Sequence, residues 1–447
     1  MNKRFRKQIY LEVITLILSL LIPLSIGAYD IPGISGTPDP IFNLTVGTGT
    51  IVTGDGNSVH MWLYGVEGSI LQYPGPTIIV NQGDNVTINL TNNLPVPVSL
   101  VIPGINVTAA AVAPGTALPG ILTREVPADD GATTVAYTFT ASQPGTFVYH
   151  SGTNPPLQVE MGLLGAIIVR PSGFGPPPNR RAYGDADSAY NHENLFLLTD
   201  MDIRVHNAVR NGNLSDIDFS DYHDVYWFIN GRTAPDTLAI NAPWLKHQPY
   251  HSIARLNPGQ SILYRVINAS RDPHPWHTHG NHHRIIARQS QFRSTNPGGA
   301  VGADLGELAF TTAMYPGDTM DAIMTWTGEN VGWDIYGVPD GIINTHTCVD
   351  SGNGFDATTH EWCADHGKPI PVILPNIQNL TVGPFYSGSA FLGAFGALPP
   401  GEGGFNVNAG FFFMQHSHNE KELTNNNIFP GGMLTFLIIE PPSAPVE

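Results

Sequence analysis

Hydrophobic and polar positions alternate along this chain in short runs that are separated by turn residues. The clearest run is TIIVNQGDNVTINLTNNLPVPVSLVI, residues 77–102, in which β-branched residues alternate around a Gly-Asp turn. AYTFTASQPGTFVYH and GLLGAIIVRP continue the pattern to residue 171. A period of two with Gly and Pro between runs predicts β-strands.

The second half of the chain repeats this pattern. VYWFING, SIARLNPGQSILYRVINAS and MYPGDTMDAIMTW pair strand-like runs with Pro-Gly or Asn-Gly turns. The chain has no long segment with a helical period. Strand-like runs do not alternate with helical ones, so a parallel sheet is not predicted. The pattern predicts an all-β protein built from two related antiparallel units, sandwiches or barrels of Greek-key type.

Proline and glycine also mark the predicted boundaries between these units. GFGPPPNRR, residues 173–181, interrupts the strand pattern as a stiff connector would. We expect a first domain at 29–172, a linker at 173–189 and a second domain at 190–447. A stretch rich in Gly, Pro, Asn and Asp, residues 336–405, is predicted to be a loop insertion in the second domain.

The first 28 residues run from a basic KRFRK cluster through an apolar stretch to Gly27-Ala28. This pattern is typical of a secretory signal peptide. The alternative is an uncleaved anchor, but Glu12 and Pro23 interrupt the apolar run. We expect a secreted, periplasmic or cell-surface protein with no stable membrane span after cleavage.

Composition narrows the range of partners. The 447 residues include 20 Lys and Arg against 37 Asp and Glu, for a net charge of −17. Gly and Pro are abundant, at 48 and 38, which fits many turns. Since the chain has no basic stripe to neutralise phosphates, nucleic acid is not an expected partner.

Cys348 and Cys363 are the only cysteines in the chain and are 15 positions apart. In an exported protein, such a pair is expected to form a disulfide. Metal ligation by the thiolates is the alternative, because His346, His360 and His366 flank them. The oxidising compartment favours the disulfide.

Two of the histidine clusters suggest a metal site. They are RDPHPWHTHGNHHR, residues 271–284, and FFMQHSHNEK, residues 412–421. In a strand, residues i and i+2 project from one face, so His277 with His279 and His416 with His418 would each aim two rings together. Four neutral imidazoles suit copper or zinc. The alternative is that they are solvated surface histidines.

These residues carry a resemblance to a known family. HPWHTHG resembles the HPxHxHG motif of multicopper oxidases, and MQHSHNEKELTNNNIFPGGMLTFLII resembles their C-terminal HCHxxxH segment. LTNNLPVPVSLVIPG and PGTFVYHSGTNPPLQVEMGLLGAIIV resemble the first-domain copper motifs. The resemblance implies cupredoxin-like domains, a copper cofactor, and a two-domain layout like that of nitrite reductases, with a homotrimer as the expected assembly. A three-domain monomer is the alternative.

By this resemblance, His277 and His279 match type 2 and type 3 copper ligands, and His416 and His418 match type 3 ligands. His274 matches a type 1 ligand, and His150 matches a cluster ligand in the first domain. The metal-site candidates are therefore His277, His279, His416, His418, His150 and His274.

Several family ligands are missing from this chain. Ser417 stands at the position of the type 1 cysteine, and Glu422 at that of the second type 1 histidine. Val101, Pro103 and Gly152 replace further histidines. A blue copper centre needs a thiolate, so none is expected. Glu420 and Glu422 are predicted to be solvated. The alternative is that they accept hydrogen bonds from groups near the metal.

These features predict an exported copper oxidoreductase with a type 2 or binuclear histidine site that acts on a small molecule. The alternative is a non-catalytic copper-binding or scaffold protein with the same fold. Loss of the thiolate favours the alternative, and retention of both His-x-His pairs favours the oxidoreductase.

Overall fold

The fold is described from a computed structural model of the chain. The structure describes residues 31–36, 38–129, 131–330, 332, 334, 347–368 and 411–439. The predicted signal peptide at 1–28 and most of the predicted insertion at 336–405 lie outside the described residues. The prediction of an all-β fold is confirmed.

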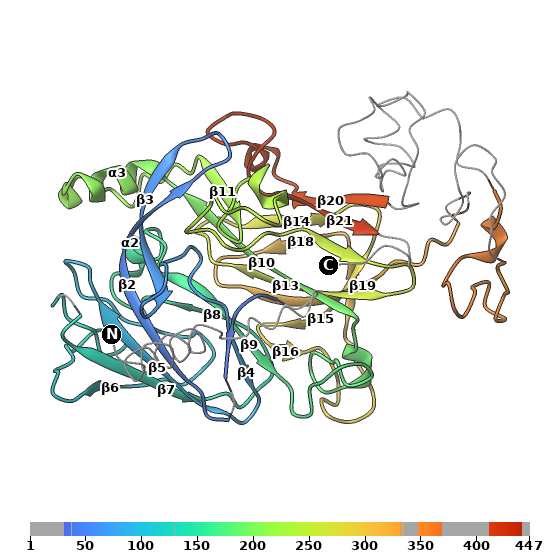
Figure 1. Ribbon diagram of the computed structural model, residues 1–447, viewed down its shortest axis with the longest axis horizontal. Coiled ribbons are helices and arrows are strands. Elements are labelled where there is room, and N and C mark those ends of the chain that lie inside the picture. The colour runs from blue at the N-terminus through green and yellow to red at the C-terminus, as the bar shows by residue number, and fades with distance from the viewer. Residues whose placement is uncertain are drawn as a thin grey trace, which may run out of the picture.

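The first half of the chain forms two sheets that pack face to face (Figure 1). Along β5, buried side chains alternate with more accessible ones, whereas every side chain of β9 is buried. The five-stranded sheet has the order β3 (Ser58–Val66), β2 (Ile41–Val52), β5 (Asn85–Asn92), β7 (Thr134–Thr140), β6 (Thr108–Val112). The four-stranded sheet has the order β1 (Ile34–Ser35), β4 (Ile78–Asn81), β9 (Leu164–Arg170), β8 (Gly145–His150).

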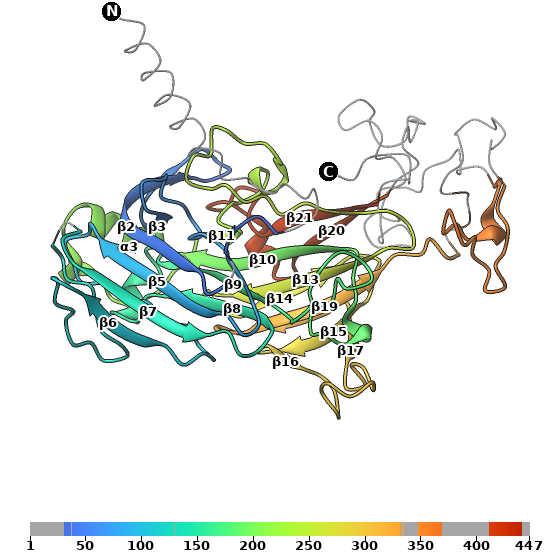
Figure 2. The same cartoon turned by 60° about the horizontal axis from the view of Figure 1, so that its bottom comes forward.

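The second half of the chain forms another pair of sheets, seen to the right of the first pair in Figure 2. The larger sheet has the order β11 (Tyr226–Ile229), β10 (His192–Met201), β13 (Ser261–Asn268), β19 (Thr319–Thr325), β15 (His283–Arg288), β16 (Gln291–Phe292), and β17 (Glu307–Ala309) pairs with β15. The facing sheet has the order β12 (Ala254–Leu256), β21 (Leu434–Ile439), β20 (Phe411–Ser417), β14 (His274–Thr278), β18 (Thr311–Met314).

The prediction of antiparallel units is wrong in one respect. The pairs β2–β5, β4–β9, β10–β13 and β12–β21 are parallel. In a Greek-key sandwich the chain leaves one sheet, passes through the facing sheet and returns, so sheet neighbours can run parallel without a crossover helix. Hairpins have local turn signals in the sequence, whereas these long-range pairings have none.

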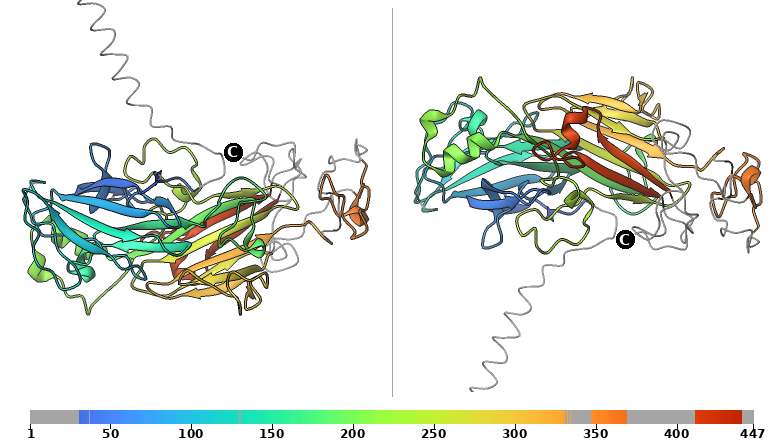
Figure 3. Two further views of the ribbon diagram at one scale, coloured as in Figure 1. Left: turned by 90° about the horizontal axis from the view of Figure 1, so that it is seen from below. Right: turned by 90° about the horizontal axis from the view of Figure 1, so that it is seen from above.

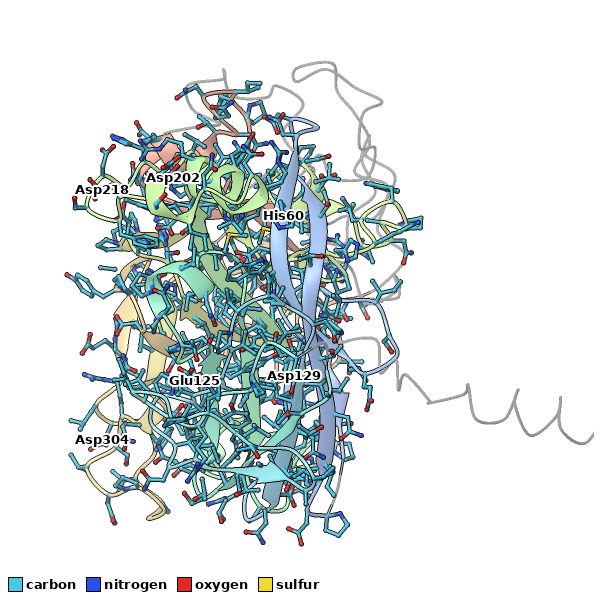
Figure 4. All side chains as sticks on the ribbon, turned by 90° about the vertical axis from the view of Figure 1, so that its left-hand side faces the viewer. His60, Glu125, Asp129, Asp202, Asp218 and Asp304 are labelled. Carbon is cyan, nitrogen blue, oxygen red and sulfur yellow. A yellow bond between two sulfur atoms is a disulfide. The ribbon has the colours of Figure 1, made fainter. Side chains whose placement is uncertain are left out.

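The helices are short. They are α2 (Pro155–Gln158) and α3 (Ile203–Arg210), with 3-10 turns η1 (Ala186–Ser188), η2 (Leu214–Asp216), η3 (Asp236–Leu238), η4 (Cys363–Asp365) and η6 (Glu420–Leu423). Asp202 caps α3, because its carboxylate accepts a hydrogen bond of 2.9 Å from the amide of Arg204. Figure 4 shows Asp202 beside α3, and His60 on the neighbouring strand β3. Among the described residues, no helix has the length and apolarity needed to cross a membrane.

One buried core joins the two halves. It includes Met61 and Ile168 from the first pair of sheets and Leu197 and Phe228 from the second. β8 of the first sandwich contacts β13 and β19 of the second, consistent with this shared core, and the views in Figure 3 show the two sandwiches side by side. The two halves therefore form one body in which the second sandwich is held against the first.

The predicted disulfide is confirmed. Cys348 and Cys363 are bonded, with their Cα atoms 5.5 Å apart. The segment around them, residues 347–368, is the orange loop at the edge of the molecule in Figure 1.

Candidate metal centre

The two His-x-His pairs meet on neighbouring strands. β14 and β20 pair antiparallel, and their register places His277 directly opposite His416. Residues opposite each other in an antiparallel pair point to the same face, and so do residues two positions along a strand. All four imidazoles of the two pairs should therefore gather on one face of the sheet.

The ring distances agree with this register. The ring centre of His277 lies 4.8 Å from that of His279, 5.3 Å from that of His416 and 4.7 Å from that of His418. The centres of His279 and His416 are 5.0 Å apart. Two strands that are far apart in sequence thus bring four imidazoles into contact, which we call the four-histidine cluster: His277, His279, His416 and His418.

Three of these side chains offer nitrogens that converge. One ring nitrogen from each of His277, His279 and His416 lies within 4.8 Å of the other two. The Nε2 atoms of His279 and His416 are only 2.9 Å apart. Two imidazole nitrogens at about 2.0–2.1 Å from one ion, at about a right angle, stand about 2.9 Å apart. The donor set therefore fits a single transition-metal ion.

Hydrogen bonds determine which nitrogen of His416 can bind a metal. Its Nδ1–H donates to the carbonyl oxygen of Ser417 at 2.6 Å. This bond leaves the lone pair on Nε2, the atom that faces His279. On β18, Thr311 is the register partner of His277, and its hydroxyl lies 2.7 Å from Nδ1 of that histidine.

Burial keeps two members of the cluster, His277 and His416, uncharged at neutral pH. Desolvation, followed by the neighbouring histidines, lowers the pKa of His277 to about 4. Desolvation likewise lowers the pKa of His416 to about 4. Copper and zinc bind neutral imidazole, so these two side chains are already in the ligating form at pH 7.

An aromatic and apolar rim borders the cluster. The ring of Phe310 lies 6.0 Å from that of His277 and 5.5 Å from that of His282, nearly perpendicular to both. Phe310 is 55% exposed, and Leu308 in β17 is 70% exposed. His418, the fourth member of the cluster, is also exposed. The cluster therefore lies near the surface.

His150 lies in a different part of the fold. It ends β8, is half-buried, and donates a 2.9 Å hydrogen bond from Nδ1 to the carbonyl of Ser151. In the part of the chain that the structure describes, it is not a member of the group of converging nitrogens. Val101 pairs with it through two backbone hydrogen bonds. Val101 and Gly152 stand at positions where the family resemblance expects histidines. They are neighbours in the fold, because a Cβ at Gly152 would lie 2.7 Å from the Val101 side chain.

His274 is placed differently from the cluster. It is fully buried, its Nδ1 donates to Glu422 at 2.8 Å, and its Nε2 lies 2.7 Å from the hydroxyl of Ser270. Both ring nitrogens are therefore engaged within the protein. Glu422 is only 2% exposed, so the expectation that it is solvated is wrong, whereas Glu420 is exposed as expected.

Thr311 and Phe310 are parts of the site that were not predicted. Both belong to the run LAFTTAM, which looks like an ordinary strand. Only the register of β18 against β14 brings Thr311 to His277. A pairing between distant strands cannot be deduced from either strand alone.

Two β-sandwiches with a surface cluster of neutral histidines define a cupredoxin-like protein with a candidate copper centre. Residues 46–173 match the family model described as multicopper oxidase. Residues 46–173 therefore form a multicopper oxidase domain, in agreement with the predicted resemblance to this family, and the predicted cupredoxin-like fold is confirmed. Copper is the cofactor that this family implies.

Individual relatives agree. The chain is 30% identical over 160 residues to copper resistance protein A of Escherichia coli, covering 36% of this chain and 22% of that protein. It is 28% identical over 215 residues to a copper-containing nitrite reductase of Pseudomonas chlororaphis, covering 47% of this chain and 53% of that protein. The chain thus spans about half or less of the length of these curated relatives.

Among solved structures, the fold is similar to that of a blue copper oxidase from Nitrosomonas europaea. The TM-score is 0.52 at 20% sequence identity, and the match covers 89% of this chain and 85% of the other. At this identity the likeness concerns the fold.

Proposed function

We propose that this protein is an exported copper oxidoreductase that works through a type 2 or binuclear site in the four-histidine cluster. The observation that carries the proposal is the 2.9 Å approach of two imidazole Nε2 atoms, with a third histidine nitrogen within 4.8 Å. Copper bound there would supply one-electron redox chemistry to a small-molecule substrate.

The chain's own residues would hold and orient the metal. The proposed ligands are His277, His279, His416 and His418. The carbonyl of Ser417 fixes the orientation of the His416 ring. The exposed side chains of Phe310 and His418 border the cluster, so we expect a small molecule to approach it from that side. An open position distinguishes a reactive metal site from a structural one.

A blue type 1 centre has no place in this proposal. Ser417 is fully buried and offers a hydroxyl where a thiolate would be needed. Since His274 is bonded to Glu422 and Ser270, it is not among the proposed ligands. Electrons must then reach the cluster directly from the substrate.

Export and trimer formation belong to the same proposal. The basic, apolar leader at 1–28 supports export to the periplasm, cell surface or medium. In a homotrimer, His150 of one subunit would complete the cluster of the next. Its engaged Nδ1 leaves Nε2 for a metal, and Leu122 next to Gly152 is 60% exposed, as an interface residue would be before assembly. The domains at 29–172 and 190–447 stay a prediction.

Metal analysis tests the proposal. Wild type, His277→Ala/His416→Ala and the matched control His223→Ala, an exposed histidine, are loaded with Cu²⁺, dialysed and analysed for bound copper. We expect the double variant to lose copper and the control to keep it, with no intense blue absorption in any sample. Equal copper in all three would refute the site.

Turnover is measured on the same samples as copper-dependent consumption of oxygen with a phenol. Activity that is lost with the copper supports the oxidoreductase. Copper binding without turnover of any phenol or nitrogen oxide would favour the scaffold role.

A further inference from the structure

The disulfide lies among groups that the copper chemistry does not use. Its loop, residues 347–368, is referred to below as the disulfide module. Ligand atoms of Cys348, Glu361 and His366 lie within 4.8 Å of one another. The second sulfur, that of Cys363, is bonded to the first. Two sulfurs, an imidazole and a carboxylate therefore share one small volume.

Two buried carboxylates converge on the imidazole. The Nδ1–H of His366 donates to Glu361 at 2.8 Å and lies 3.3 Å from a carboxylate oxygen of Asp334. Glu361 and Asp334 are each only 1% exposed. Two buried carboxylates thus lie beside one imidazole, and carboxylate oxygen and imidazole nitrogen are both metal donors.

The surrounding charge points the same way. The described residues of the module, together with the neighbouring Asp334, have five carboxylates against one lysine. The carboxylates are Asp334, Asp350, Asp356, Glu361 and Asp365, and the lysine is Lys368. The local field therefore attracts cations.

The geometry points to a redox-gated site for a thiophilic cation, Zn²⁺ in particular, formed by Cys348, Cys363, His366 and Glu361 once the disulfide is reduced. In a tetrahedral zinc site with these donors, the ligand atoms stand about 3.3–3.8 Å apart. The observed grouping within 4.8 Å fits this size after small side-chain rotations. Sulfur, nitrogen and carboxylate oxygen are all established zinc donors.

The reduction balances with a dithiol as reductant. The dithiol gives two electrons and two protons to the S–S bond, which breaks to leave two thiols, and the dithiol becomes a cyclic disulfide. Zinc then displaces the two thiol protons to solvent and binds the thiolates. In the oxidised state the sulfurs bind each other, so the metal is excluded.

The test uses the full chain with His277→Ala/His416→Ala, so that the four-histidine cluster does not contribute. The protein is reduced with a phosphine, desalted under argon and titrated with Zn²⁺ against a chromophoric chelator. We expect one additional zinc equivalent in the reduced protein relative to the oxidised protein. In this background the outcome is independent of the proposed oxidoreductase activity.

Matched variants identify the ligands. Cys348→Ser/Cys363→Ser should show no gain on reduction. His366→Ala should bind at least about tenfold more weakly, whereas His360→Ala, an exposed histidine of the same module, should bind as the parent does. A reduced parent that takes up no additional zinc overturns the proposal, whether or not the module keeps its near-ultraviolet circular dichroism. Equal weakening by the two histidine variants also overturns it.

Discussion

A buried acid at the junction of the two sandwiches gives a sharp test of what holds them together. Glu193 in β10 is completely buried at its side chain and pairs with Arg170 of β9 and with Arg265 of β13. The hydroxyl of Tyr190 donates to the same carboxylate at 3.0 Å. We predict that Glu193→Gln destabilises the protein strongly, because it leaves two buried arginines facing a neutral amide.

The magnitude follows from the pKa. Burial alone would raise the pKa of Glu193, but Arg170 and Arg265 outweigh it and lower the pKa from 4.5 to about 2. A difference of about 2.5 units corresponds to about 3 kcal/mol of stability at neutral pH. Because the folded pKa is the lower one, this contribution is present above about pH 4.5 and is lost as the pH falls towards 2.

The assay is urea unfolding followed by tryptophan fluorescence, at intervals between pH 7 and pH 2.5. Glu193→Gln should be about 3 kcal/mol less stable than wild type at pH 7, and the gap should narrow as the pH falls. The matched control is Glu307→Gln, which removes an exposed acid paired with Arg293 and should cost at most about 1 kcal/mol. Equal effects of the two variants, or a gap that stays constant with pH, would refute the reasoning.

Three further predictions concern Asp200, Thr311 and Glu422. Burial raises the pKa of Asp200 to about 7, so its protonated form stabilises the folded protein at low pH, and this contribution is lost as the pH rises from 4 through 7. In urea unfolding, Asp200→Asn should therefore show a smaller change of the free energy of unfolding with pH over this range. Thr311→Val should weaken copper binding about 10- to 100-fold in a chelator competition, because it removes a hydrogen bond that orients the ring of His277. Thr311→Ser, which keeps the hydroxyl, should not weaken binding. Glu422→Leu should cost about 1–3 kcal/mol in thermal unfolding by leaving the buried His274 without its acceptor, and Glu422→Gln should recover most of that loss.

The four-histidine cluster could be predicted because it depends on two local rules. A period of two places His277 with His279, and His416 with His418, on common faces, and this is visible in the sequence. Only the resemblance to the family indicated that the two pairs face each other, because it aligned both motifs with known ligand positions. The register that sets His277 opposite His416 then gives the distances.

The parts that could not be predicted depend on contacts between distant strands. Thr311 becomes a partner of His277 only through the pairing of β18 with β14. Glu193 lies in HENLFLLTDM, where nothing shows that arginines from β9 and β13 will enclose it. The burial of a charged residue is decided by its partners, which the local sequence does not contain.

The same two strands explain why the proposed copper site does not depend on a type 1 centre. Side chains alternate across a strand, so Ser417 points to the face opposite to its neighbours His416 and His418. His274 and His277 are three positions apart on β14 and therefore also occupy opposite faces. Ser417 and Glu422 are both buried, and the Glu422 carboxylate accepts a hydrogen bond from His274. The imidazoles of the four-histidine cluster lie on the other face, so the proposed binding of a metal there would not require a thiolate at position 417.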